Sequence, residues 1–387
     1  MERCKAILAD LVAFPTVSSA RNLDIITYLS RALEAAGARL WTETDATGQK
    51  ANLFATIGPD RPGGVVLSGH TDVVPVEDQP WSSDPFALVE RRGRLYGRGT
   101  CDMKGFVAAC IAMAPRFATA ELRVPVHFAF TYDEEIGCFG AQALVDSLAA
   151  RGIEPAAAII GEPTMMQPVD GHKGCYEYTT WVTGLEGHGS APARGVNAVE
   201  YAARLVMELV RFRSALRTRA PEDCPFDPPY STINLGALTG GHAHNVIPGK
   251  ARIDWEMRPV QASDADVVKG GLSRLIEEEL LPEMRVTFPE AQIETETVAE
   301  VAGLERRPQN AARDLVMALT GVNDAGLVPF GTEAGLFQSI GIPSVICGPG
   351  AIDQAHKPDE YLSLQQLAQC LQMLERLADR LAQGPIT

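Results

Sequence analysis

Hydrophobic positions in the first part of the chain follow two different periods. Short apolar runs at residues 65–68, 126–130 and 156–160 have the length of buried strands. Between them, apolar residues recur at helical spacing around residues 106–113, and an amphipathic pattern covers residues 1–14. Because strands alternate with helices, we expect an α/β fold with a mixed, largely parallel sheet flanked by helices.

The pattern changes near residue 175. Residues 176–182 alternate between polar and apolar side chains, as in an antiparallel strand with one exposed face. A first domain of residues 1–174 plus 293–387 is therefore predicted, interrupted by an α+β domain at residues 175–292. Within the insertion we expect helices at 197–217 and 264–279 and strands at 232–238, 251–258 and near Gln292; after it, helices at 308–320 and 363–383 and a strand at 344–347.

Length, composition and charge favour a globular enzyme over a nucleic-acid-binding or membrane protein. A length of 387 residues favours about two domains, and 46% apolar with 21% charged residues is ordinary for a globular enzyme. The formal charge of −15 argues against a nucleic-acid partner, because phosphate binding needs clustered Lys and Arg. No apolar run reaches the roughly 18 residues of a membrane span. The N-terminus lacks a signal-peptide pattern and the eight cysteines are scattered, so we expect a cytoplasmic location without a membrane partner.

Side chains of metal-ligand type follow several predicted strands directly. Ligands of open α/β sheets gather beyond the carboxyl ends of the strands, so these side chains are expected to meet. Asp102 lies separately, in a glycine-rich segment before a predicted helix. The strand-end residues are His70 and Asp72 after the first strand, Glu134 and Glu135 after the second, Glu162 after the third and His356 after the late strand at 344–347.

These residue types suit two ions of the zinc kind. Imidazole and carboxylate groups bind Zn²⁺ and its neighbours, and two ions need about five protein ligands if one carboxylate bridges them. Asp72 is placed to hold the second imidazole nitrogen of His70. Glu134 should diverge from Glu135 and serve as general base beside a metal-bound water. The five predicted ligands are His70, Asp102, Glu135, Glu162 and His356.

Each residue taken alone has a simpler interpretation. Asp102 could cap the helix that follows it, and the pair Glu134 and Glu135 could form a solvated turn. A single histidine at a strand end is usually a structural hydrogen-bonding residue, which is what we expect of His127 and His172. The metal site is favoured because several such residues occur at separate strand ends.

At these motifs the chain resembles the M20 family of zinc peptidases and deacylases over nearly its whole length. The order and spacing match, with 32 residues from His70 to Asp102, 32 to Glu134 and 28 to Glu162. Within the family, the chain is most similar to the acetylornithine deacetylases at residues 195–198, 245–249, 330–335 and 348–360. The motifs shared with the whole family are Ser68–Pro75, Gly97–Gly105, Asp133–Glu135, Gly161–Thr164 and Gly187–Pro192.

The resemblance implies a fold of the di-zinc exopeptidase type and a homodimer formed through the insertion, which would act as a lid and dimerisation domain. It implies two Zn²⁺ per subunit, with Co²⁺ or Mn²⁺ also possible. His70 and Glu162 would complete one site, Glu135 and His356 the other, and Asp102 would bridge them.

Other residues take roles in substrate binding by the same resemblance. His188 would reach the site of a partner subunit and donate to the oxyanion, and Asn245 and Arg258 would hold the substrate carboxylate. Simpler alternatives remain open: a glycine-rich turn for His188, a surface charge for Arg258 and a helix N-terminal acid for Glu333. The pocket would be completed by Gly331, Thr332 and Glu333, with Glu333 attracting a side-chain ammonium.

The implied activity is metal-dependent removal of the acyl group from a small N-acyl amino acid. N-acetyl-L-ornithine, cut to L-ornithine and acetate in arginine biosynthesis, is the first candidate. Succinyl-diaminopimelate desuccinylase, another N-acyl-amino-acid deacylase or a dipeptidase are the alternatives within the family. A catalytically inactive, metal-stabilised binding protein is a further alternative, disfavoured because the full set of ligands, the base and the lid histidine is present.

Overall fold

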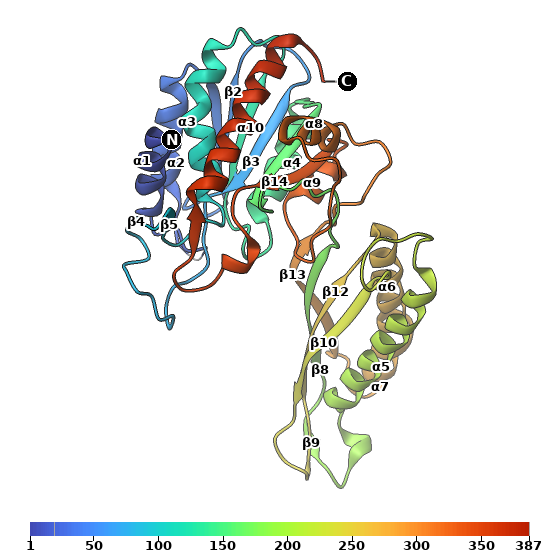
Figure 1. The fold of residues 1–387 in the computed structure, drawn as a ribbon. Helices are drawn as coiled ribbons and strands as arrows, with labels where there is room; N and C mark the ends of the chain where they lie inside the picture. The colour runs from blue at the N-terminus through green and yellow to red at the C-terminus, as the bar shows by residue number, and fades with distance from the viewer. Residues whose placement is uncertain (19, 387) are drawn as a thin grey trace. The chain divides into compact units, whose positions relative to one another are not determined.

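The computed structural model describes residues 1–18 and 20–386. The chain forms two compact units (Figure 1). The first comprises Met1–Gly171, Arg306–Val328 and the described chain from Thr332 onward, and the second comprises His172–Glu305 and Pro329–Gly331. Of the described residues, none belongs to a helix that is both long and apolar enough to cross a membrane.

A six-stranded sheet with the order β1-β2-β6-β3-β7-β14 forms the centre of the first unit. Strands β6, β3, β7 and β14 run parallel, whereas β1 and β2 pair antiparallel at one edge. This arrangement confirms the predicted mixed, largely parallel sheet. The four parallel strands are buried along their whole length, which explains their continuous apolar sequences. The bounds are β1 (Arg39–Thr44), β2 (Ala51–Ile57), β3 (Val65–His70), β6 (Val126–Thr131), β7 (Ala157–Pro163) and β14 (Ser344–Gly348).

Helices cover both faces of this sheet (Figure 1). On one face, five helices share a single apolar core with the strands. On the other, α4 and α9 pack together and against the strands, outside that core. The first group is α1 (Glu2–Val12), α2 (Leu23–Ala35), α3 (Lys104–Thr119), α8 (Ala311–Thr320) and α10 (Leu364–Gln383), and the second is α4 (Phe139–Ala150) and α9 (Ala334–Ser339).

A three-stranded sheet with the order β15-β5-β4 also belongs to the first unit. Its strands are short, and β15 brings residues near the C-terminal end of the chain beside a hairpin from its first quarter. This pairing fixes where the segment after His356 lies relative to the segment that contains Asp102. The bounds are β4 (Val89–Arg91), β5 (Arg94–Tyr96) and β15 (Tyr361–Ser363).

The second unit is an antiparallel sheet, with the order β10-β12-β8-β13, whose helices share a separate apolar core. The helix predicted from Asn197 begins there because the Asn197 side chain accepts hydrogen bonds from the amides of Val199 and Glu200. A short ribbon pairs β9 with β11. The bounds are β8 (Cys175–Thr183), β9 (Gly187–His188), α5 (Ala198–Leu216), β10 (Thr232–Gly240), β11 (Val246–Ile247), β12 (Lys250–Arg258), α6 (Ala262–Arg274), a π-helix (Leu275–Leu280), α7 (Leu281–Thr287) and β13 (Gln292–Val301).

Strand β13 extends the second unit beyond the residue where the sequence pattern places its end. The strand begins at Gln292 and pairs with β8 as far as Val301, so the unit continues to Glu305. Residues 294–298 are exposed and, apart from Val298, polar, so they carry no apolar alternation that would mark a strand.

Candidate metal centre

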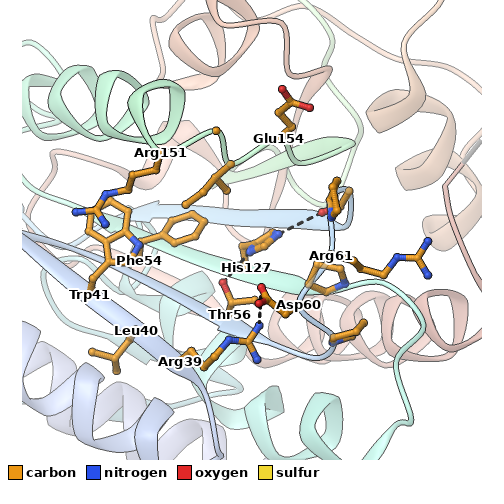
Figure 2. A pocket seen from close by; sticks show the side chains of 16 residues that line it. Arg39, Leu40, Trp41, Phe54, Thr56, Asp60, Arg61, His127, Arg151 and Glu154 are labelled. Carbon is orange, nitrogen blue, oxygen red and sulfur yellow. Dashed lines mark hydrogen bonds and ion pairs between the residues drawn. The ribbon is translucent and has the colours of Figure 1, made fainter.

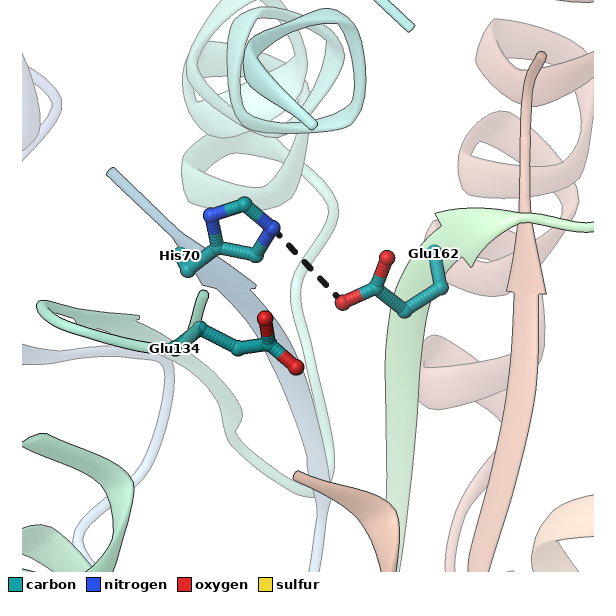
Figure 3. Close-up of side chains that lie close together, drawn as sticks. All are labelled: His70, Glu134 and Glu162. Carbon is teal, nitrogen blue, oxygen red and sulfur yellow. Dashed lines mark ion pairs between the residues drawn. The ribbon is translucent and has the colours of Figure 1, made fainter. Parts of the chain in front are cut away.

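The predicted metal ligands meet at the carboxyl ends of the parallel strands. His70 is the last residue of β3, Glu162 lies near the end of β7, and Glu134 follows β6 (Figure 3). Asp102 precedes α3, and His356 follows β14. Since parallel strands end at the same edge of a sheet, residues far apart in sequence become neighbours there.

Asp102 lies between the two histidines. The Nε2 atom of His70 is 3.1 Å from Asp102 Oδ1 and 3.7 Å from Glu162 Oε1. The Nε2 atom of His356 is 3.3 Å from Asp102 Oδ2 and 3.0 Å from Glu135 Oε2. Each oxygen of one carboxylate therefore faces a different imidazole, which is the arrangement that a ligand shared by two cations requires.

The donor set fits divalent cations. Ligand atoms of His70, Glu134 and Glu162 lie within 4.8 Å of one another, and so do those of His70, Asp102 and Glu135. Oε1 of Glu162 is buried and has no hydrogen-bond partner among the described residues. A buried carboxylate oxygen without a partner is costly, and a bound cation would satisfy it.

The crowding of acids changes their proton affinities. Burial raises the pKa of Glu134 and Glu162 well above the usual carboxyl range, and burial together with Asp102 raises that of Glu135 to about 7. Burial also disfavours the charged form of Asp102, but hydrogen bonds from His356 and His70 hold its pKa below the usual value. Bound cations would stabilise all four carboxylates in the charged form.

Asp72 supports two parts of the cluster. The Nδ1 atom of His70 is 2.9 Å from the Asp72 backbone oxygen and 3.6 Å from its carboxylate Oδ1, so the backbone makes the shorter contact. The carboxylate accepts hydrogen bonds from the amides of Glu134, at 3.1 Å, and Glu135, at 3.3 Å, and from Ser18 Oγ, at 2.7 Å. Asp72 thus orients the His70 ring and fixes the segment that carries both glutamates.

His356 adopts an uncommon backbone conformation. Its φ is +62°, in the left-handed region that residues other than glycine rarely occupy. Such strained residues concentrate at functional sites, where the surrounding structure holds them in place. The His356 side chain is 51% exposed, whereas that of His70 is fully buried. The His356 end of the cluster is therefore the one nearer to solvent.

Glu333 lies close to the cluster in the first unit. Its carboxylate is buried and accepts hydrogen bonds from Ser68 Oγ of β3, at 2.9 Å, and from Thr131 Oγ1 of β6. Glu333 is the N-cap residue of α9, but its side chain makes no capping hydrogen bond. Thr332 Oγ1 instead accepts from the amide of Ala334. Glu333 therefore links the ends of two strands that carry site residues.

The remaining predicted residues belong to the second unit. His188 is exposed in β9, and its Nδ1 atom is 2.7 Å from Ser190 Oγ. The backbone oxygen of Asn245 accepts from the amide of Gly189, so Asn245 lies beside His188. Arg258 ends β12, and its Nε and Nη2 donate to Glu256 Oε2 at 3.2 and 2.9 Å. Gly331 is also grouped with this unit.

Asn245 and Arg258 are not brought together within one chain. Asn245 directly precedes β11, five positions before β12 begins at Lys250, and Arg258 is the last residue of β12. Eight residues of strand correspond to about 26 Å. One small substrate carboxylate therefore cannot contact Asn245 and Arg258 of the same chain.

A cavity of about 480 Å³ lies at the opposite end of the first unit's sheet, near the beginnings of β3 and β6 (Figure 2). Its lining includes Trp41, Phe54 and His127 but none of the predicted ligands. The ring nitrogens of His127 lie 2.9 Å from Thr56 Oγ1 and 3.2 Å from the oxygen of Gly63, and burial lowers its pKa to about 4. His127 is therefore a neutral hydrogen-bonding residue at pH 7, and the cavity lacks the metal ligands found at the other end of the sheet.

The sequence profile of the peptidase family M20/M25/M40 matches residues 66–380. The chain belongs to this family. It is 35% identical to an acetylornithine deacetylase from Shigella sonnei (strain Ss046), with 91% of each protein covered. It is thus a metallohydrolase of the M20 family, whose candidate ligands converge as described above.

Solved structures of M20 proteins share the fold. An M20 family metallo-carboxypeptidase from Sulfolobus solfataricus superposes with a TM-score of 0.74 at 18% identity, covering 99% of this chain and 100% of that one. A dinuclear metal-binding peptidase of the family from Bacillus subtilis gives 0.63 at 19% identity, covering 99% and 98%. At these identities, the likeness supports the architecture alone.

Several residues around the cluster were not predicted from the sequence. Ser18 and Thr131 donate hydrogen bonds to acids of the site, and Glu360 accepts from the amide of Asp102. Small hydroxyl residues have no distinctive sequence signal. Glu360 does lie in a segment that carries part of the M20 resemblance, which is its one signal in the sequence, and its burial is evident only in the structure.

Proposed function

We propose that this M20 hydrolase removes the acyl group from a small N-acyl amino acid, with N-acetyl-L-ornithine as the first candidate substrate. The observation that carries the hydrolytic part is the position of Asp102, whose two oxygens face His70 and His356. The choice of substrate is supported by 35% identity to an acetylornithine deacetylase over 91% of both proteins.

His70, Glu162 and Asp102 would hold one cation, and Glu135, His356 and Asp102 the other. Zn²⁺ is the first candidate, and Co²⁺ or Mn²⁺ accept the same donors. When bound, such a pair of cations polarises a carbonyl group and lowers the pKa of water from about 15.7 towards about 7.

Glu134 is the proposed general base. Asp72 fixes its backbone, and its carboxylate lies near His70 and Glu162, where a water activated by the cations would be within its reach. Glu134 takes the proton of the attacking water and then passes it to the nitrogen of the leaving amine. His188 donates a hydrogen bond to the oxygen on which negative charge develops.

A homodimer formed through the second unit is part of the proposal. His188 and Asn245 lie at one end of β12 and Arg258 at the other, about 26 Å away along the strand. A substrate that contacts all three would need His188 and Asn245 from a second copy of the chain. The eight unpaired cysteines fit the reducing cytoplasm, the location that we propose.

Mixing two inactive variants tests whether His188 acts across subunits. Unfolded and refolded together, His188→Ala and Glu134→Gln chains should recover about a quarter of wild-type activity, because half of the dimers are mixed and one of their two sites is intact. Each variant refolded alone is the control. If His188 acts within its own chain, the mixture will show no recovery.

A deacylation screen tests the substrate class. N-acetyl, N-succinyl and N-formyl amino acids and dipeptides are offered to the zinc- or cobalt-loaded chain, with the released amine measured. We expect the highest kcat/KM for N-acetyl-L-ornithine and at least about tenfold less for N-succinyl-diaminopimelate, because a larger acyl group must fit the same pocket. Preference for dipeptides over every acylated amino acid would instead support a dipeptidase.

A further inference from the structure

A buried ion pair lies behind the candidate metal centre. Glu360 and Arg98 are each about 1% exposed, and Arg98 Nη1 donates to Glu360 Oε2 at 2.8 Å. The same oxygen accepts from the amide of Gly99 at 3.0 Å. The other oxygen accepts from the amides of Cys101, at 2.8 Å, and Asp102, at 3.1 Å. Three of these four hydrogen bonds thus hold the backbone of the segment that carries the shared ligand.

Arg98 also connects this segment to the loop of His356. Its Nη1 donates to the backbone oxygen of Lys357 at 3.3 Å, and its Nη2 donates to Gln79 Oε1 at 2.6 Å. The amide nitrogen of Gln79 in turn donates to the backbone oxygen of His356 at 3.0 Å. The loop of Asp102 and the loop of His356 are therefore fixed to each other through side chains that ligate nothing themselves.

A buried ion pair such as Arg98 and Glu360 contributes little to the net stability of a fold. Removing two charges from water is expensive, and well-packed apolar residues often replace a buried ion pair without loss of stability. What charged and directional groups supply is a defined geometry, because each oxygen of Glu360 and each amino group of Arg98 has a specific partner. Ligands that must share two cations need that accuracy.

We propose that Arg98, Glu360 and Gln79 are positioning residues that keep Asp102 and His356 at the spacing two cations require. The inference rests on the proposed two-cation site. Glu360 acts on both cations, since it holds the backbone of the shared ligand. Gln79 acts mainly on the cation that His356 would bind, since it donates directly to the His356 backbone and reaches the Asp102 segment only through Arg98.

Titration of the full-length, metal-free chain with Co²⁺, followed by calorimetry and visible absorption, tests this proposal. Glu360→Gln should weaken binding of both ions by about 10- to 100-fold, because the amide loses the charge and at least one acceptor position. Gln79→Ala should weaken the binding of one Co²⁺ ion and leave the affinity for the other within about twofold of wild type. The visible spectrum should change only for the weakened ion.

Asp359→Asn is the matched control. Asp359 is adjacent to Glu360, but its carboxylate accepts from the amide and hydroxyl of Ser82 and makes no contact with the pair. The Asp359→Asn chain should bind both Co²⁺ ions with the affinities of the wild type. Circular dichroism checks that each variant is folded. If Glu360→Gln does not fold, the Co²⁺ affinities of Gln79→Ala test the positioning role.

The outcomes separate the two proposals. Wild-type affinity for both ions in a folded Glu360→Gln chain, or in Gln79→Ala, overturns the positioning role and leaves the proposed function intact. A wild-type chain that binds no Co²⁺ overturns the two-cation site itself, and the positioning role with it.

Discussion

Replacing Glu134 with glutamine is expected to lower kcat by about 10²- to 10⁴-fold while two cations stay bound. The amide has the same shape but cannot accept the proton of the attacking water. The backbone contact that orients this residue, from its amide to Asp72 Oδ1, does not depend on the side chain. The measurement is kcat on N-acetyl-L-ornithine together with the metal content of the purified variant.

The metal content decides between two roles for Glu134. Its carboxylate lies near His70 and Glu162, so the geometry also permits it to act as a ligand. Loss of one cation in Glu134→Gln would show a ligand, and turnover near that of the wild type would contradict the general base. Asp146→Asn, an exposed acid on the following helix α4, is the control and should keep full activity.

Replacing Asp102 with asparagine should remove both cations and reduce activity to that of wild-type chain treated with a chelator. One oxygen and the negative charge are lost, so the two histidines no longer share a carboxylate. If Asp102 bound only one of the two cations, its replacement would release only that cation. The measurement is metal content after dialysis, with residual activity compared before and after adding excess Zn²⁺.

Retention of two ions in Asp102→Asn would mean that another group bridges them. The control is Asp84→Asn, an exposed loop acid of the first unit whose side chain accepts from the amide of Phe86. Re-addition of Zn²⁺ should restore the chelated wild type and the control but not Asp102→Asn. That difference separates a missing ligand from a missing metal.

The sequence predicted the cluster because its geometry follows from a simple rule. His70 and Glu162 end or nearly end buried parallel strands, and such strands end together. The apolar runs were long enough to identify the strands, and the residue types indicated the chemistry. Asp102 was harder to place, because it lies in a loop and a helix cap was an equally natural interpretation.

Long-range contacts could not be predicted in the same way. Glu360 and Arg98 are 262 positions apart, and the pairing of β15 with β5 brings their segments together. The separation of Asn245 from Arg258 depends on the length and direction of β12, which a list of motif residues does not contain. The end of the second unit was missed because β13 is exposed along residues 294–298.

The contacts of Glu333 could not be predicted from the sequence. The sequence placed it near the pocket, as an acid that attracts a substrate ammonium. In the structure both its oxygens receive hydroxyl donors, from Ser68 and Thr131. These contacts support a role in holding β3 and β6 together, and attraction of a basic substrate stays a prediction.

The division of the chain separates two kinds of evolutionary change. Every candidate ligand and the proposed base belong to the first unit, whereas His188, Asn245 and Arg258 belong to the second. Under the proposed function, mutations in the second unit would alter which acylated compound is accepted while the proposed ligands and base of the first unit stay unchanged. A scaffold organised in this way could evolve to act on different amides while keeping the same hydrolytic residues.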